Sequence, residues 1–537
     1  MESEASKNNS EIKIYTFPGT LVEKIEPYFK DKNLFTLEEL EQLGEKDESL
    51  RPITIHETEN FSDKNGYKKL QELSAALKQT SRIGTYNQYV EELREEDVER
   101  ILENSLGKGH NAAADLITER ISLIAPRIFT LWLTTFERGV SLLQKSTRRI
   151  EHNAYFIPKE FSKNERIMKE YSSIIAVINE DYNKLLECFD EEERKKYRED
   201  AMYIQPLSLL TSLTADISLR AFWQMFLESG ITSNSKGEKI INDRGGLDAI
   251  FEYSSKIFDV LQQKNKLLVR KWNTNYDQLQ HFPSGSLFLP ENGATEKLEE
   301  ILLRAYGAHT ETPIRNVIRN AVVLEISDPL HVIENYGTEK IIETLKSKEN
   351  KLKKNMYDVL KTINVKVLRV VDLSLLHQET RHRTVPKQYE PLVCAAKRAA
   401  AKIAVNKNLD SAKLFTYPEA LKGKAEIFAK DYEMLLNFWN KLINEYNTDP
   451  MSANIVLPHG LKVFVYENFD GYNLIKLSGE RLCATAKKEM QYLTQELVNK
   501  ISEIPRYGKE ISELMKQKCF YLQKCSDQVK DCPKKAF

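Results

Sequence analysis

The segment from residue 365 to residue 388 constrains the fold of this chain most, because it joins a strand pattern to a dense group of cations. Residues 365–371 read Val-Lys-Val-Leu-Arg-Val-Val, an apolar run that predicts a short strand. The stretch 378–388 then places Arg381, His382 and Arg383 in succession. If a helix covers residues 373–383, consecutive side chains diverge by about 100° around its axis, so the three cannot all point one way.

Two guanidinium groups on either side of an imidazole suit a site that holds several anionic groups at once. Arginine gives bidentate hydrogen bonds to phosphate or carboxylate, and histidine can donate or accept. The alternative is a charged helix end exposed to solvent. For an isolated Arg-His-Arg this alternative is favoured, and a second stretch far upstream changes the balance.

Length and charge limit the classes of function. A chain of 537 residues contains two to four domains at about 150 residues each. Its net charge of −1 argues against a nucleic-acid-binding surface as the main function. No apolar run reaches the roughly 18 residues of a membrane span, and residues 1–10 lack the apolar core of a signal peptide. We therefore expect a cytoplasmic protein that contacts neither nucleic acid nor membrane, with its six cysteines reduced or metal-bound.

The composition predicts a helix-rich chain, because glycine is scarce at 20 residues while Lys, Glu and Leu are abundant. Hydrophobic spacing predicts helices over 66–80, 92–106, 112–118, 128–136, 164–186, 191–203, 246–271, 295–306, 395–407, 420–446 and 474–501, and strands over 12–17, 120–124, 317–326 and 365–371. Residues 328–360 predict a lysine-rich helix pair on an outer face. The turn-rich residues 281–296 are interpreted as a linker between two halves, 12–280 and 297–537.

The upstream stretch carries arginines and serines at fixed spacing, on a helix expected to end near residue 147: Arg138, Ser141, Gln144, Ser146 and Arg148. Taken alone, the two serines are interpreted as ordinary helix-surface residues and Arg148 as part of a basic helix end. Set beside residues 381–383, they resemble the motif of the flavin-dependent thymidylate synthases, also called thymidylate synthase complementing proteins. That motif reads Arg-His-Arg, two residues, Ser, four residues, Ser, one residue, Arg, with Glu two residues before the second Ser.

Each half keeps a different part of this motif. The second half keeps the front, and its later positions hold Pro386, Pro391 and Val393. The first half keeps the back, with Phe136 and Glu137 at the front and Gln144 in place of the usual Glu. The two halves thus resemble complementary remnants of one motif.

Further positions agree with the family pattern in both halves. A glycine-histidine turn, Gly109-His110, precedes Asp115 by the family's spacing. A proline followed by a later arginine occurs twice, as Pro206 with Arg220 and Pro458 with Arg481. Other family positions have changed or lie in the tail: Ser229 and Tyr472 replace one arginine in each half, Met202 and Asn454 replace another, and Cys519, Cys525 and Cys532 are spaced as in some archaeal members.

The resemblance implies an α+β, helix-rich fold of two tandem domains, each with a small sheet covered by long helices. It implies FAD, NADPH and methylenetetrahydrofolate as cofactors and a nucleotide, dUMP, as the substrate that becomes dTMP. The cofactors carry the difficult chemistry and the protein positions them. The implied roles are catalysis by Arg381, His382 and Arg383; substrate binding by Gln144, Ser146, Arg148 and Arg481; and cofactor binding by His110, Arg138, Arg220 and residues 381–383.

If the halves pack as family subunits do, a homodimer would imitate the tetramer of single-domain relatives, with two sites. A second class of function stays open: a family member that has lost catalysis and binds a nucleotide or flavin, or only assembles. Bland interpretations also stay open for single residues. His110 is as consistent with a helix cap as with flavin contact. The tail cysteines are one ligand short of a closed zinc site, and we expect no metal.

Overall fold

The computed structural model describes the following residues: 32–56, 67–80, 83, 85–109, 111–136, 138–144, 153–242, 246, 248–270, 272, 286–288, 293–308, 321–380, 382–405, 414–525 and 532. The expected strand at 12–17 and four of the predicted site residues, His110, Ser146, Arg148 and Arg381, lie outside this set.

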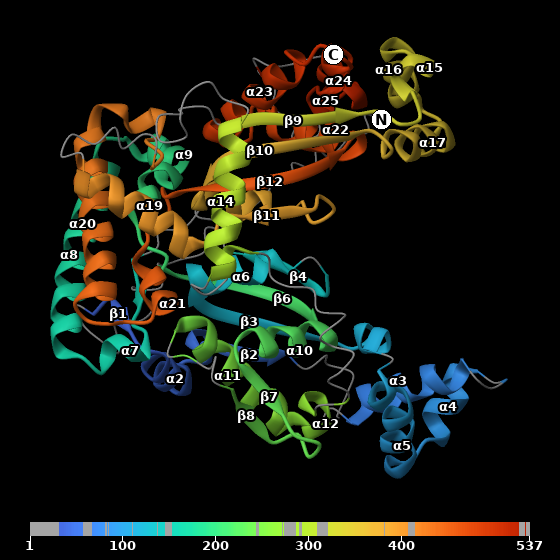
Figure 1. Ribbon diagram of the computed structural model, residues 1–537. Coiled ribbons are helices and arrows are strands. Elements are labelled where there is room, and N and C mark those ends of the chain that lie inside the picture. Colours follow the sequence, from blue (N-terminus) through green and yellow to red (C-terminus); the bar gives the residue numbers. More distant parts are fainter. Residues whose placement is uncertain are drawn as a thin grey trace, which may run out of the picture.

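Two four-stranded antiparallel sheets organise the molecule, and their strand orders correspond (Figure 1). The first sheet runs β2 (Ile53–His56), β3 (Thr118–Pro126), β6 (Leu210–Ser218) and β4 (Val140–Gln144). The second runs β9 (Ala321–Ser327), β10 (Asn364–Asp372), β12 (Lys462–Asp470) and β11 (Lys387–Tyr389). In chain order, each sheet therefore places its fourth strand between its second and third.

The central strands of both sheets lead directly into helices. In the first half β3 continues into α6 (Arg127–Thr135) and β6 into α10 (Leu219–Glu228). In the second half β10 continues into α18 (Leu373–Glu379) and β12 into α22 (Gly471–Arg481). All four of these strands contain nine residues, so positions in one half can be matched to positions in the other by their order within each element.

The long helices α8 (Glu165–Glu187) and α20 (Ala425–Asn444) lie side by side and join the halves (Figure 1). The side chain of Asn164 caps α8 by accepting hydrogen bonds from two backbone N–H groups. Both helices carry the sequence Asp-Tyr, two residues, Leu-Leu, at 181–186 and 431–436. Tyr171 of α8 stacks on Phe438 of α20 with ring centroids 6.2 Å apart.

A reciprocal backbone contact also joins the halves. The N–H of Leu207 donates to the carbonyl of Leu457 at 2.9 Å, and the N–H of His459 donates to the carbonyl of Gln205 at 3.0 Å. If Pro206 is matched to Pro458, each of these bonds is the counterpart of the other, which indicates a local twofold relationship. The largest apolar cluster contains residues of both halves, so the junction has the character of a protein core.

The remaining elements surround this frame. In the first half they are β1 (Leu34–Phe35), α2 (Leu37–Lys46), η1 (Glu48–Leu50), α3 (Tyr67–Gln79), α4 (Tyr86–Glu92), α5 (Glu95–Ser105), η2 (Leu106–Lys108), η3 (Asn111–Leu116), β5 (Tyr155–Phe156), α7 (Lys159–Ser162), α9 (Glu191–Ala201), η4 (Met202–Ile204), β7 (Ile231–Ser233), β8 (Lys239–Ile241), α11 (Ala249–Lys264) and α12 (Lys266–Val269). In the second half they are η5 (Ser286–Phe288), α14 (Gly293–Ala308), α15 (Val332–Tyr336), α16 (Thr338–Lys346), α17 (Asn350–Leu360), α19 (Leu392–Val405), η8 (Glu419–Lys424), α21 (Pro450–Ala453), η9 (Asn454–Val456), α23 (Lys488–Ser502), α24 (Gly508–Leu514) and α25 (Lys518–Leu522).

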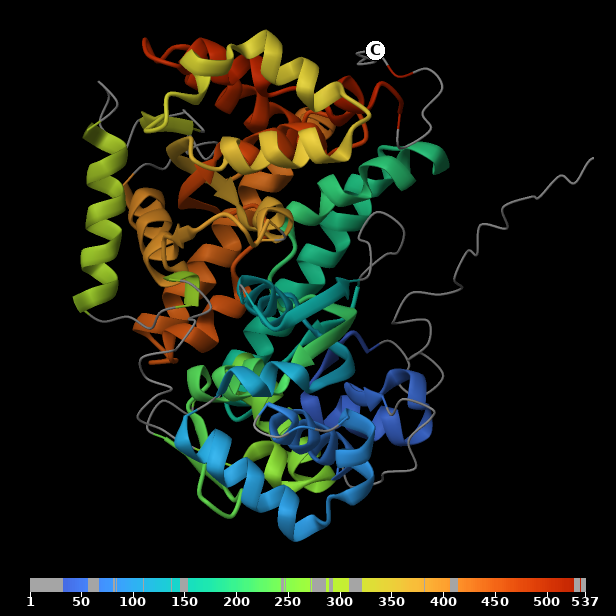
Figure 2. The ribbon, with the colours of Figure 1, turned by 90° about the vertical axis from the view of Figure 1, so that its right-hand side faces the viewer.

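The α+β, helix-rich architecture with two tandem regions is confirmed. The lysine-rich helix pair expected over 328–360 is three helices, α15 to α17, of which α16 and α17 carry the lysines and lie on the outside of the molecule (Figure 2). None of the helices that the structure describes is both long enough and apolar enough to cross a membrane. The linker assignment at 281–296 stays a prediction, and helix α14 already begins within it at Gly293.

Four local predictions are wrong. The helix expected over 373–383 ends at Glu379, because residues 382–385 form a turn. The single helix expected over 474–501 is two helices, α22 and α23, broken after Arg481. The upstream stretch around Ser141 is strand β4 rather than helix, since its backbone pairs with β6. The helix expected over 112–118 is the tighter 3₁₀ helix η3.

Gly460, at the junction of the halves, offers a test of how tightly the junction is packed. A Cβ at this position would lie 2.2 Å from Oη of Tyr432, whose ring is buried and whose hydroxyl donates to the carbonyl of Thr416 at 2.7 Å. We expect Gly460→Ala to lower the free energy of unfolding by about 1–3 kcal/mol through overpacking. Gly423→Ala is the control, because nothing lies within 4 Å of its added Cβ. Urea denaturation that gives equal midpoints for both variants would contradict the expectation.

Candidate functional site

A buried charged triad lies beneath the turn that follows α18. Lys366 and Arg369 are three residues apart on β10, so they project from opposite faces of the sheet and one must point inward. The inward residue is Arg369, whose Nη2 lies 2.9 Å from Oε2 of Glu379 and 2.5 Å from Oε2 of Glu467. No member of this Arg369 triad is more than 1% exposed.

The triad fixes its own charge state. Burial alone would lower the pKa of Arg369, but the two carboxylates raise it, so the guanidinium stays charged. Burial opposes ionisation of Glu379, yet Arg369 and then His382 bring the pKa of Glu379 down to about 2. Burial, with Glu379 nearby, raises the pKa of Glu467. Arg369 therefore pairs firmly with the Glu379 carboxylate.

His382 follows α18 three residues after Glu379 and contacts Arg481. Nη2 of Arg481 lies 3.1 Å from Nε2 of His382 and also donates to the carbonyl of Gln378 at 3.0 Å. Arginine has only donors, so Nε2 of His382 must be the acceptor and its proton must be on Nδ1. Burial lowers the pKa of His382 to about 4, and Arg481 acts in the same direction, so the ring is neutral at physiological pH.

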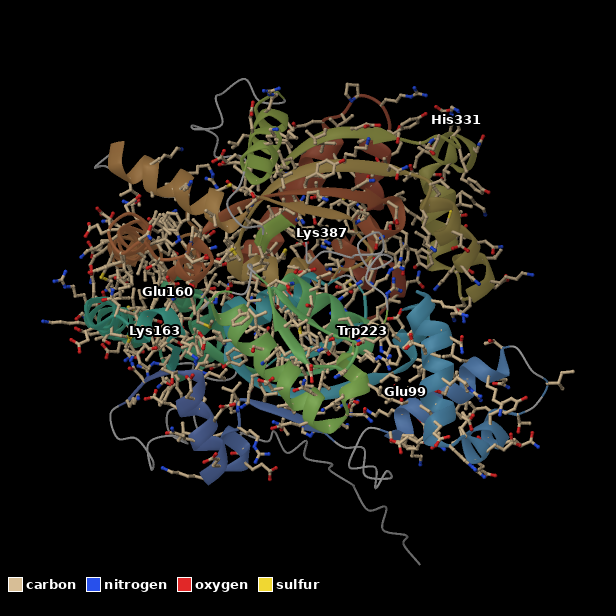
Figure 3. The ribbon with its side chains drawn as sticks, turned by 60° about the horizontal axis from the view of Figure 1, so that its bottom comes forward. Glu99, Glu160, Lys163, Trp223, His331 and Lys387 are labelled. Atoms are coloured by element: carbon tan, nitrogen blue, oxygen red, sulfur yellow. The ribbon has the colours of Figure 1, made fainter. Side chains whose placement is uncertain are left out.

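The ammonium group of Lys387 binds two backbone carbonyls of this turn. Its Nζ donates to the carbonyl of His382 at 2.6 Å and to that of Val385 at 3.3 Å. The hydroxyl of Thr384 donates to Oδ1 of Asn473, near the start of α22, at 2.7 Å. Figure 3 shows Lys387 near the middle of the molecule, on the edge strand of the second sheet. The turn that carries His382 and its neighbours is thus fixed at both ends.

Two cationic groups next to this turn retain unused hydrogen-bonding capacity. Arg383 is half-buried, burial lowers its pKa, and it makes neither an ion pair nor a hydrogen bond with any residue that the structure describes. Nε of Arg481 is buried and has no partner within the same described part of the chain. A buried donor without a partner costs free energy, so this arrangement favours an anionic ligand.

The first half contributes a second polar group near the start of α10. The hydroxyl of Ser218 donates to Oδ1 of Asp115 at 3.1 Å, and Nη1 of Arg220 lies 3.4 Å from Oδ2 of Asp115. Arg138 is exposed and precedes Gly139, whose positive φ of 73° and close contact with Ser218 exclude a side chain there. The Asp115 pairing thus occupies part of the Arg220 guanidinium.

Gln144 ends strand β4, and its Nε2 donates to the hydroxyl of Thr130 in α6 at 3.1 Å. The two motif-bearing helices meet at their carboxyl ends, where the hydroxyl of Thr380 donates to that of Thr134 at 2.9 Å. These threonines occupy matching positions after β10 and β3 and are both buried. The turns that carry Arg138 and His382 therefore both begin next to this single contact between the halves.

The structure thus brings together His382, Arg383 and Arg481 of the predicted set. Arg138, Gln144 and Arg220 lie in the first half, and the Thr134–Thr380 contact joins the helix that precedes Arg138 to the helix that precedes His382. Sequence reasoning missed the roles of four residues in the second half: Arg369, Glu379, Lys387 and Glu467. The available signal was Arg369, an arginine at an inward position of an apolar strand.

The remaining candidates for chemistry are groups of metal-ligating side chains and the cysteine thiols. Within the described ranges, no group of three or more His, Cys, Asp and Glu side chains is arranged to hold a metal ion. All six cysteines are free thiols. Burial raises the pKa of Cys394 to about 12, so this thiol stays protonated.

Comparison with known proteins identifies the family of this chain. The family described as thymidylate synthase complementing protein matches residues 62–237 and 309–505, more than half of the chain in two tandem segments. The chain therefore belongs to this family. No curated protein matches it.

Among solved structures, the chain is similar to the flavin-dependent thymidylate synthase ThyX of Helicobacter pylori complexed with FAD and dUMP. The identity is 14%, the match covers 37% of this chain and 100% of that one, and the TM-score is 0.29. It is also similar to the UMP/dUMP methylase PolB of Streptomyces cacaoi bound with 5-Br dUMP, at 14% identity over 43% of this chain and 96% of that one, with a TM-score of 0.30.

Proposed function

We propose that this protein is a cytoplasmic FAD-dependent thymidylate synthase that methylates dUMP to dTMP, with a site shared between its two halves. The observation that carries the proposal is the pair of cationic groups beside His382. In a chain of this family, Arg383, which has no partner among the described residues, and the buried Nε of Arg481 are suited to the anionic parts of a nucleotide and a flavin cofactor.

The residues of this chain would bind and orient rather than react. Arg481 would direct its free N–H groups at a nucleotide, while its Nη2 stays fixed by Gln378 and His382. His382, neutral with its proton on Nδ1, would offer that proton as a hydrogen-bond donor. Arg220 and His110 would contact FAD, and Arg138, Gln144, Ser146 and Arg148 would complete the nucleotide and flavin sites from the first half.

The described residues fit an anionic cofactor, since they include cationic donors without carboxylate partners and no competing metal-ligand group. When bound, FAD reduced by NADPH would supply the hydride, and methylenetetrahydrofolate the one-carbon unit. The protein would supply positioning and the exclusion of water.

The second candidate is a family member that has lost catalysis and binds a nucleotide or flavin, or only assembles. Met202 and Asn454 favour it, because both positions at which the family places an arginine before the Leu-Pro segment are uncharged here. Gln144 favours it as well, since it removes a carboxylate and donates its amide to Thr130.

Purified protein distinguishes the two candidates. The enzyme is expected to be yellow or to take up FAD, to bind dUMP, and to release tritium from labelled dUMP when methylenetetrahydrofolate and NADPH are supplied, with UMP tested in parallel. Protein that binds FAD and dUMP but releases no tritium from either nucleotide supports the second candidate. Protein that binds neither contradicts the proposed function.

We further propose a homodimer with two sites. Mixing Arg381→Ala chains with Arg148→Ala chains tests how each site is composed. If one site draws both residues from a single chain, each variant site lacks a residue and the mixture stays inactive. If the residues come from different chains, each mixed dimer regains one intact site of its two, which is about half of the activity of a wild-type dimer. Light scattering that shows a monomer under active conditions would contradict the dimer.

A further inference from the structure

Glu379 contacts both Arg369 and His382, through different atoms. Its carboxylate pairs with Arg369 at 2.9 Å, while its backbone carbonyl accepts from the N–H of His382 at 3.0 Å. The turn therefore holds the imidazole close enough that each group affects the pKa of the other. A carboxylate beside an imidazole ordinarily stabilises the protonated ring.

Protonation of His382 would disrupt the site. An imidazolium has no lone pair, so Nε2 could no longer accept the hydrogen bond from Arg481. Two cations would then face each other across a contact that is now 3.1 Å. The Arg481 guanidinium would have to turn away, and with it the donors that point toward the proposed nucleotide site.

We propose that Arg369 is a positioning residue, which keeps His382 unprotonated by neutralising Glu379 and thereby holds Arg481 in its binding orientation. For what the site binds, this inference rests on the proposed function. The contact between Arg369 and Glu379, and its effect on His382, can be tested without any ligand.

Among the described residues, the Arg369 triad is present in the second half only. Arg369 and Glu467 are the sixth residues of β10 and β12, and Glu379 is the seventh of α18. The matching positions in β3, β6 and α6 are apolar: Leu123, Ala215 and Leu133. All three are buried. The same strand-helix frame thus folds without these charges, so the fold does not require the triad.

Among the residues that the structure describes, the charged groups that act most on His382 come from α18, α22 and β11. Glu379 lies beneath it, Arg481 and Glu480 approach from α22, and Lys387 approaches from β11. Oε2 of Glu480 is 3.7 Å from Nε2 of His382. Arg369 and Glu467 lie behind Glu379. A test must therefore change Glu379 while it leaves Glu480, Arg481 and Lys387 in place.

Two variants that differ only at Glu379 meet this requirement. Arg369→Leu with Glu467→Ala removes one positive and one negative charge and leaves Glu379 without its partner. Adding Glu379→Leu places all three residues of the first half in the second. The proton NMR signal of His382, assigned by its loss in His382→Gln, reports the titration of the ring in each protein.

We expect the wild-type ring to stay neutral down to about pH 4. In the double variant its midpoint is expected to rise by at least one pH unit, and in the triple variant to return to the wild-type value or below. Arg369→Lys, which keeps a charge but not the forked geometry, is expected to give a smaller rise. A double variant that titrates like wild type overturns the inference, as does a rise of equal size in both variants.

Binding measurements then connect the charge state to the site. Calorimetry with dUMP on FAD-loaded protein is expected to show at least a tenfold loss of affinity in the double variant at pH 6, with recovery in the triple variant. Equal affinity in double variant and wild type overturns the role of Arg369 in the site. If wild-type protein binds neither FAD nor dUMP, the proposed function fails, and the NMR titration alone decides whether Arg369 controls His382.

Discussion

Arg369→Leu is expected to lower the free energy of unfolding by about 3–5 kcal/mol, because it leaves Glu379 and Glu467 buried without their cation. Urea denaturation followed by circular dichroism measures the loss. The effect should be larger at pH 8 than at pH 5, since at the lower pH protons taken up by His382 or by the carboxylates compensate part of the buried negative charge.

The matched variant replaces the whole triad with the residues of the first half: Arg369→Leu, Glu379→Leu and Glu467→Ala. We expect its stability to lie within about 2 kcal/mol of wild type, because a buried ion-pair group exchanged for apolar residues is often neutral or stabilising. The smaller side chains cost some packing. If the triple variant is as unstable as Arg369→Leu, the charges themselves hold the second half together and the comparison between halves fails.

The elements that sequence analysis located well are those with strong local signals. Asn164 caps the helix expected over 164–186, and the apolar run 365–371 is a central strand. The helix ends were located less well. The helix after β10 stops at Glu379, shortly before the turn formed by residues 382–385. The contact of Glu379 with Arg369, ten residues away, depends on sheet geometry and has no local signal.

The site was predicted in part, and for a physical reason. The cations of the motif could be found by spacing, since family binding residues keep fixed intervals. The buried triad could not be found in this way, because Glu467 reaches Arg369 across a strand pair 98 residues apart in sequence. The break between Arg481 and Lys488, which lets the Arg481 side chain turn toward His382, likewise had no local signal in a continuous helical pattern.

A second buried pair, between the long helices, gives the molecule its clearest pH dependence. Asp181 and Asp431 occupy matching places in α8 and α20 and are 2% and 0% exposed. Lys430 contacts the Asp181 carboxylate and lies 3.7 Å from Oδ1 of Asp431. Burial raises the pKa of Asp431 to about 8, and the charge of Asp181 acts in the same direction. Although burial opposes it, hydrogen bonds from Lys430 and Lys184 lower the pKa of Asp181.

The sign of the pH effect follows from these directions. Between its ordinary value of 3.8 and about 8, Asp431 is protonated in the folded protein and ionised in the unfolded chain. The folded state binds the extra proton, so the free energy of unfolding falls as pH rises through this range, by up to about 1.4 kcal/mol per pH unit. Asp248, Glu252 and Asp372 have raised pKa values and act in the same direction, so the test must compare variants rather than absolute slopes.

Asp431→Asn is expected to remove the contribution of this one proton. The amide is uncharged at every pH, as the protonated carboxyl is at low pH. Relative to wild type, the variant should therefore gain about 2–4 kcal/mol between pH 5 and pH 8.5, measured by urea denaturation at both values. Asp358→Asn, an exposed carboxylate paired with Lys361, is the control and should show no comparable gain. If the stabilities of Asp431→Asn and wild type change in parallel across this range, Asp431 is ionised in the folded protein. Lys430, rather than a proton on Asp431, would then compensate the charge of the two aspartates.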